Sequence, residues 1–199
     1  MERSVDEIVA LVRSRQVGFH GPDESPLSCP PLAQKDALTN EERRLGFQLP
    51  PLLKRLYCEV CNGGFGPGYG LIGLSGGASD DLGRTAPEIY ESFLTQAPSD
   101  LGWSWPRRLL PICNWGCAIY SCVDCTAPDF PMKIFDPNLH ANSQSWADAF
   151  FDEASSFEVW IEAWGCGQDL WEKSYGDEGF ITRELRRRGP NGLNREPRP

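Results

Sequence analysis

Eight cysteines are the residues of this chain whose spacing could support chemistry. Six of them form three close pairs, Cys58/Cys61, Cys113/Cys117 and Cys122/Cys125. Two such pairs at knuckle-like spacing would supply the four ligands of a tetrahedral zinc ion. The apolar patterns, however, place the first pair inside a helix and the next three cysteines inside strands. We expect buried structural thiols at those positions, because a free cysteine packs as a small hydrophobic residue.

The pair Cys122/Cys125 is the best half-site for a metal, because it lies at the end of a predicted strand. A small zinc-binding module built on this pair is therefore an alternative. The chain has only two histidines, His20 and His140, so no histidine cluster complements the pair. We predict no bound metal and no other cofactor.

The stretch CEVCNGGFGPGYGLIGL, residues 58–74, is rich enough in glycine to suggest a phosphate-binding loop. A P-loop would end in GK[ST], which is missing here. A dinucleotide-binding turn follows a strand and precedes a helix, whereas this loop has the reverse order. The stretch is therefore predicted to be a helix end followed by a turn into a sheet.

Nucleophilic catalysis has no support in the sequence. The chain has no GxSxG motif, and nothing in the sequence brings Cys166 and His140 together. Aspartates in loops usually form turns, so they are weak evidence for general acids. We therefore predict a protein that is not an enzyme and has no small-molecule substrate.

Charge is the remaining candidate for function. The chain carries a net charge of −9, yet the Arg-rich residues 183–199 carry +4, so the preceding body carries −13. An acidic body repels nucleic acid and attracts basic proteins, although acidity also serves solubility. Four acids in predicted loops are the candidate partner-binding residues, namely Asp80, Asp81, Asp124 and Asp129.

Helices are predicted where capping residues precede apolar residues at helical spacing. Ser4 and Glu7 form a capping box that opens a predicted helix over residues 4–15. Thr39 and Glu42 form a second box, and Ser155 and Glu158 form a third. A further helix is predicted from residue 49, and Asn62-Gly63-Gly64 is expected to end it in a left-handed conformation. Another helix is predicted over residues 86–97. Gly46 is expected to end the helix opened by Thr39.

Strands are predicted over residues 69–74, in 109–123 as a pair around a tight turn at Trp115-Gly116, over 131–137 and over 145–151. Short connections favour antiparallel pairing. The fold class is therefore α+β, a single domain with a mostly antiparallel sheet of about four to six strands covered by helices.

Three regions are expected along the chain: an N-terminal helix and Pro-rich loop (1–37), the α+β domain (38–182) and a basic, disordered tail (183–199). The charged N-terminus predicts no secretory signal, and the apolar runs are far shorter than the roughly 18 residues of a membrane span. We therefore expect a cytoplasmic protein without membrane contact, whose cysteines are reduced.

Residues 38–74 resemble the signature of the SUKH superfamily, the family of the fungal cell-wall assembly regulator. The matching residues are Glu42, Leu45, Gly46, Leu49, Pro50, Leu53, Leu56, Tyr57, Asn62, Gly63 and Gly64. The stretch PICNWGCAIYSCVDC, with Trp115 and Gly116, resembles a bacterial branch, and SSFEVWIEAW, with Trp160, resembles the closing helix of the family. The Arg-rich tail has no counterpart in this pattern.

The resemblance implies a compact α+β domain without enzymatic activity. Bacterial members of this family look like immunity proteins that bind and neutralise a cognate toxin, often a nuclease. The expected partner is then a basic toxin domain that meets the acidic body. An intracellular regulator or scaffold, as among the fungal members, is the alternative of a different class.

Overall fold

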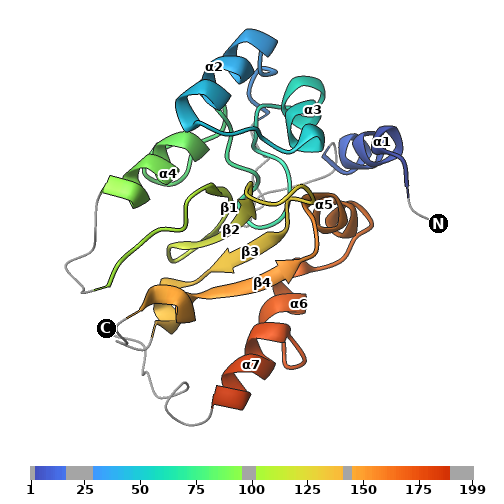
Figure 1. Cartoon of the computed structure of the whole chain (residues 1–199). Coiled ribbons are helices and arrows are strands. Elements are labelled where there is room, and N and C mark those ends of the chain that lie inside the picture. Colours follow the sequence, from blue (N-terminus) through green and yellow to red (C-terminus); the bar gives the residue numbers. More distant parts are fainter. Residues whose placement is uncertain (1–2, 17–28, 96–101, 141–144, 189–199) are drawn as a thin grey trace.

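The computed structural model describes residues 3–16, 29–95, 102–140 and 145–188 (Figure 1). Its elements, in chain order, are α1 (Val5–Gln16), α2 (Lys35–Leu45), α3 (Pro51–Glu59), α4 (Ala86–Thr95), β1 (Leu109–Gly116), β2 (Ile119–Asp124), β3 (Met132–Phe135), the 3-10 turns η1 (Pro137–Leu139) and η2 (Trp146–Ala149), β4 (Phe150–Ala154), α5 (Phe157–Gly165), α6 (Leu170–Tyr175) and α7 (Phe180–Arg188). The four strands pair antiparallel in the order β1-β2-β3-β4. The predicted α+β class is confirmed.

The sheet is covered on both faces. Tyr120 of β2 pairs with Phe135 of β3, so their side chains share one face. Phe93 of α4 packs against both rings, at centroid distances of 5.7 and 5.9 Å. On the other face, the indole of Trp160 in α5 reaches Glu153 of β4. Figure 1 shows α6 and α7 beside the β4 edge of the sheet.

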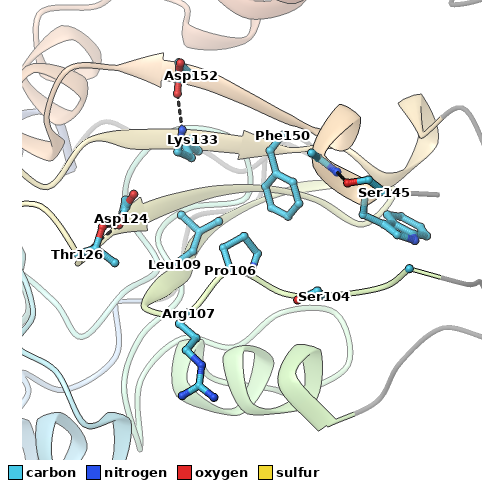
Figure 2. Close-up of a pocket in the computed structure, with 13 residues that line it drawn as sticks. Ser104, Pro106, Arg107, Leu109, Asp124, Thr126, Lys133, Ser145, Phe150 and Asp152 are labelled. Atoms are coloured by element: carbon cyan, nitrogen blue, oxygen red, sulfur yellow. Dashed lines mark hydrogen bonds and ion pairs between the residues drawn. The ribbon is translucent and has the colours of Figure 1, made fainter. Parts of the chain in front are cut away.

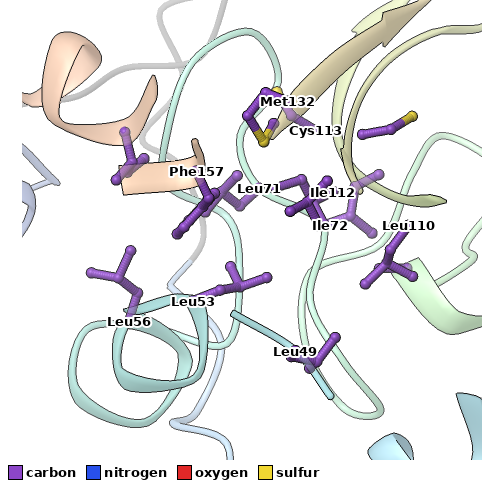
Figure 3. Packing of buried hydrophobic residues seen from close by; sticks show 14 of the residues in the cluster. Leu49, Leu53, Leu56, Leu71, Ile72, Leu110, Ile112, Cys113, Met132 and Phe157 are labelled. Carbon is purple, nitrogen blue, oxygen red and sulfur yellow. The ribbon is translucent and has the colours of Figure 1, made fainter. Parts of the chain in front are cut away.

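The main core joins α3 to the sheet and to α5 (Figure 3). Leu53 and Leu56 of α3 are completely buried, as their helical spacing predicts. Leu71, Ile112 and Phe157 pack in the same cluster. Each large apolar side chain buried in this way contributes about 1.5–3 kcal/mol to stability. The core thus holds α3 and α5 against the sheet.

Two of the three predicted capping boxes are wrong. The box at Ser4 is confirmed, because the Ser4 N–H donates to the Glu7 carboxylate at 2.7 Å. Thr39 instead lies inside α2, where its hydroxyl donates to the Lys35 carbonyl. Gly46, with φ of +77°, ends this helix as expected.

Helix α5 is capped by Ser156, one residue beyond the predicted Ser155. The Ser156 Oγ accepts the Val159 N–H at 3.1 Å. Two adjacent serines offer two possible cap registers, and strand β4, which runs to Ala154, decides between them.

The hairpin of β1 and β2 turns at Cys117-Ala118, not at Trp115-Gly116. Cys117 and Ala118 have φ of +51° and +61°. Positive φ at both central residues belongs to the two-residue turn that matches the twist of a hairpin. The turn leaves Cys117 exposed, so the expectation that this thiol is buried is wrong.

Two predicted strands are also corrected. Residues 69–74 form no strand: they meet β1 through an isolated bridge between Leu71 and Cys113, with backbone hydrogen bonds from Tyr69 to Asn114 and from Ile72 to Ile112. The Leu71 backbone itself bonds to Gly64 and Phe65. Residues 146–149 form the turn η2, so β4 begins at Phe150.

The turn after α3 explains the Asn-Gly-Gly signature. Helix α3 ends at Glu59, so the glycines shape the following turn and do not stop the helix. The Asn62 Oδ1 accepts the Leu74 N–H at 2.9 Å. Gly63 has φ of +86°, and a Cβ there would lie 2.6 Å from the Leu71 carbonyl oxygen. Only glycine fits that close approach.

The expectation of a disordered tail from residue 183 is wrong for residues 183–188, which belong to α7. Ile181 of this helix is fully buried with Ile119, Ile134 and Phe151. Residues 189–199 lie outside the described part of the chain. No helix within the described part is long and apolar enough to cross a membrane.

Candidate partner-binding site

The cysteines are not all reduced thiols. Cys29 and Cys61 form a disulfide, with their Cα atoms 5.5 Å apart. The sequence pattern predicts Cys61 inside a helix, but α3 ends at Glu59 and Cys61 lies beyond it. The disulfide ties the segment before α2 to the residue before the Asn-Gly-Gly turn. The Ala33 N–H of the same segment donates to the Tyr57 carbonyl in α3 at 2.9 Å. The disulfide pair is thus a structural link.

The best half-site for zinc is buried. Cys122 is completely buried in β2, and burial raises the pKa of its thiol well above the ordinary value. Burial likewise raises the pKa of Cys125 to about 12. Zinc binds the thiolate form, which such burial disfavours. Within the described ranges, no three His, Cys, Asp or Glu side chains are grouped so that they could hold a metal ion.

His140, expected in a loop, packs inside the domain. Its ring stacks on Trp146 with centroids 4.0 Å apart, and its Nδ1 lies 2.7 Å from Asp148 Oδ1. His140 is almost fully buried. A histidine enclosed in this way positions η2 and is screened from a substrate in solution.

Asp80 is not a surface acid, contrary to expectation. Its side chain is only 1% exposed and forms an ion pair with Arg84 at 2.8 Å. It also accepts the backbone N–H groups of Leu82 and Arg84, and Tyr120 donates to it at 3.4 Å. A carboxylate satisfied from four directions holds the loop before α4 together and is not available to a partner.

Asp81, the neighbouring residue, is exposed and lies beside Asn114, near the end of β1. The side-chain amide of Asn114 donates to its carboxylate. Asn114 also accepts the Gly116 N–H at 2.8 Å through its Oδ1. Asp81 is therefore held at the hairpin end of the sheet with its outer side open to solvent.

Asp124 lines a hollow of about 480 Å³ on the sheet face that carries Phe150 (Figure 2). Thr126 holds its carboxylate through the backbone N–H at 2.9 Å and the hydroxyl at 2.6 Å. Lys133 and Asp152 form an ion pair across the same hollow. Arg107 also lines it, so the two acids here are balanced by two cations.

Asp129 lines a second groove, of about 510 Å³, which we call the proline groove. It is formed by Pro50, Pro51, Pro128, Asp129, Phe130, Ser155, Ser156, Phe157, Glu158 and Val159. Asp129 and Glu158 are its charged residues, and no cation lines it. Neither carboxylate takes part in an ion pair within the described residues. The groove is therefore net acidic.

The four predicted acids do not form one patch. Asp80 and Asp81 lie near Tyr120 and Asn114, at the hairpin end of β1 and β2. Asp124 ends β2 four residues after Tyr120, which corresponds to roughly 13 Å along a strand. Glu158 shares the groove with Asp129. The sequence pattern assigns Glu158 to a capping box and therefore does not indicate it as a partner-binding residue.

These features define an α+β domain with acidic and mixed-charge hollows, in which Cys29 and Cys61 form a structural link and His140 is enclosed. The model of the SMI1 / KNR4 family (SUKH-1) matches residues 32–163, and the chain belongs to this family. The resemblance found in the signature residues is thereby confirmed. Members are generally non-catalytic proteins of the immunity or regulator type. No curated protein matches the chain.

Proposed function

We propose that this chain is a non-enzymatic immunity protein that binds and neutralises a basic toxin domain. The observation that carries the proposal is the proline groove, where Asp129 and Glu158 face solvent without a cation. Unpaired carboxylates on a surface are the groups that a basic protein can neutralise. Family membership supports a protein partner.

The charge of the whole body supports the same partner. Residues 1–182 carry −13, so their field attracts a positively charged protein over a distance set by the Debye length, about 8 Å at physiological salt. Such steering acts mainly on the association rate. A toxin that cleaves nucleic acid has a basic surface and would be steered in this way.

The direct test uses the toxin domain encoded next to the gene of this chain. Association with the wild-type protein is compared with association with Asp129→Lys and Glu158→Lys at low and high salt. We expect each charge reversal to slow association several-fold at low salt, and high salt to reduce the difference. Asp36→Lys is the matched control, because Asp36 is an exposed acid in the first turn of α2 and makes no ion pair among the described residues.

Equal association rates for the wild type, both groove variants and the control, at every salt concentration, would contradict binding through acidic groups. If no neighbouring gene encodes a toxin, the alternative of an intracellular regulator or scaffold gains support, since the family includes proteins of that type. Metal analysis of the purified protein tests the remaining alternative, zinc bound near Cys122 and Cys125.

A further inference from the structure

A set of aromatic rings, here called the aromatic surface, lies at the hairpin end of the sheet. It comprises Tyr69, Trp115, Trp171 and Tyr175. Trp171 stacks on Tyr175 with centroids 4.2 Å apart and lies 5.5 Å from Trp115. Tyr69 is 54% exposed and Trp171 is 38% exposed, although both are large apolar residues. Exposed aromatic residues grouped in this way indicate an interaction surface.

The rings are held in place from beneath. The Trp115 indole donates to Ser121 Oγ at 2.8 Å, and the Tyr175 hydroxyl donates to Asp136 Oδ2 at 2.9 Å. Glycines allow the rings to lie on the backbone: a Cβ on Gly68 would lie 2.8 Å from the Trp115 ring, and one on Gly116 would lie 3.1 Å from the Tyr69 ring. Rings fixed before binding lose little side-chain entropy when a partner docks.

One carboxylate lies beside the rings. Asp169, the cap of α6, lines the same hollow as Trp115. It forms no ion pair within the described residues. Exposed aromatic faces beside such a carboxylate suit a cation, which the faces attract by cation–π interaction and the carboxylate by charge.

The protein already uses this chemistry next to the aromatic surface. The guanidinium carbon of Arg15 lies 5.0 Å from the centroid of the Trp164 ring. Arg15 and Trp164 line a hollow of about 300 Å³ together with Trp115 and Asp169. An arginine over an indole is thus a stable arrangement in this part of the fold.

We propose that the aromatic surface is the anchor for an arginine side chain of the protein partner, whose guanidinium stacks on the exposed rings beside Asp169. For the identity of the partner this inference rests on the proposed function, whereas the chemistry of the surface does not depend on it. The aromatic anchor controls dissociation, because buried contacts of this kind set the lifetime of a complex. The acids of the proline groove control association.

The two surfaces can be tested separately because α5 separates them. The proline groove includes Phe157 at the start of this helix, and the hollow beside the aromatic surface includes Trp164 near its end. Seven residues of helix correspond to roughly 10 Å. Substitutions on one surface therefore leave the contacts of the other unchanged.

The first experiment needs no toxin. The full chain is titrated with a tetra-arginine peptide and, separately, with tetra-lysine, and the indole N–H signals of Trp115 and Trp171 are followed by NMR. We expect tetra-arginine to shift both signals and to bind several-fold more tightly than tetra-lysine of the same charge. Equal binding of the two peptides, or shifts confined to the proline groove and the sheet hollow, would overturn the inference.

The second experiment uses the toxin domain encoded next to the gene. Tyr69→Ala and Trp171→Ala are expected to weaken binding by about tenfold or more through faster dissociation, the range of an interface anchor. Leu94→Ala is the matched control, because Leu94 is a 46% exposed apolar residue of α4, and it should bind as the wild type does. Thermal melting of each variant confirms that it is folded.

The outcomes separate the two proposals. A toxin bound equally by the wild type, Tyr69→Ala and Trp171→Ala overturns the aromatic anchor and leaves the proposed function intact. A wild-type protein that binds no neighbouring toxin contradicts the proposed function, while the peptide titration still decides whether the aromatic surface binds arginine.

Discussion

The indole N–H of Trp160 donates to the Oε1 of Glu153 at 2.7 Å, which joins helix α5 to strand β4 inside the domain. The hydroxyl of Ser121 donates to the same oxygen at 3.0 Å. The second oxygen of Glu153 has no hydrogen-bond partner. Burial raises the pKa of this carboxyl from 4.5 to about 7, although both hydrogen bonds favour the charged form. Glu153 is therefore a buried acid whose neutral form suits the fold.

This environment predicts that Glu153 makes the protein less stable as pH rises. The folded state holds the proton more tightly than the unfolded state, so the contribution of Glu153 is intact below pH 4.5 and is lost as pH rises to about 7. A shift of this size corresponds to on the order of 3 kcal/mol. Glu153→Gln keeps the acceptor oxygen and removes the charge, so we expect it to stabilise the protein most above pH 7.

Urea unfolding of the wild type and Glu153→Gln at pH 5, 6, 7 and 8 measures this contribution. The difference in unfolding free energy between the two should grow with pH. Asp152→Asn is the control, because Asp152 is the adjacent residue and its side chain is 89% exposed. A constant difference between the wild type and Glu153→Gln across this range would mean that Glu153 is charged in the fold at all these pH values.

Gly63 provides a second prediction, which separates backbone conformation from crowding. Gly63 and Gly76 both have positive φ, +86° and +75°. A Cβ on Gly63 meets the backbone of Leu71 and Gly73 at 2.6 Å, whereas a Cβ on Gly76 meets nothing within 4 Å. We expect Gly76→Ala to lower the free energy of unfolding by about 1 kcal/mol, and Gly63→Ala to lower it by at least about 2 kcal/mol more.

Thermal and urea unfolding of both glycine variants give the comparison. Equal losses of stability would show that the turn can move away from Leu71, and the close packing would not explain the Asn-Gly-Gly signature. If Gly63→Ala does not fold at all while Gly76→Ala does, the prediction is supported in its strongest form.

The parts of the fold that could be predicted from sequence are those set by local periodicity. The spacing of Leu53, Leu56 and Tyr57 predicts the buried face of α3, and the structure buries all three. The alternation of apolar runs with turn residues predicts the antiparallel sheet. These signals involve residues close in sequence, so they survive without knowledge of the tertiary structure.

The candidate site could be predicted only in part, because exposure depends on distant residues. Asp80 is buried by Arg84 and by Tyr120, which is 40 residues away. The aromatic surface exists because α6 brings Trp171 next to Trp115, and no local sequence pattern predicts that contact. The turn at Cys117-Ala118 was missed because neither residue is a usual turn former, while the preceding glycine is.

The disulfide between Cys29 and Cys61 leads to a third prediction. It closes a loop with a sequence separation of 32 residues, for which chain entropy predicts a stabilisation of about 3–4 kcal/mol. Reduction, or the substitution Cys29→Ser, should therefore lower the melting temperature by several degrees. Cys166→Ser is the control, because Cys166 is an exposed free thiol and its loss should change little.

Alkylation followed by mass spectrometry tests whether the disulfide forms. Protein denatured without reductant should take up six alkyl groups, since six cysteines are free, and eight after reduction. Eight groups without reductant would show that the thiols of Cys29 and Cys61 are reduced under the conditions of isolation, and the stabilisation would then be absent.

The last prediction concerns helix α7, which replaces part of the expected disordered tail. A chain that ends at Thr182 keeps only the first three residues of this helix, too few to form a stable turn. Ile181, completely buried with Ile134 and Phe151, would then lose its fixed position, at a cost of about 1.5–3 kcal/mol. A chain that ends at Arg188 keeps the whole helix and the hydrogen bond from Arg188 to the Asp148 carbonyl, so we expect its melting temperature to be close to that of the full chain.

Differential scanning calorimetry of the three chains makes the comparison. Equal melting temperatures for the chain ending at Thr182 and the full chain would show that α7 contributes nothing to the stability of the domain.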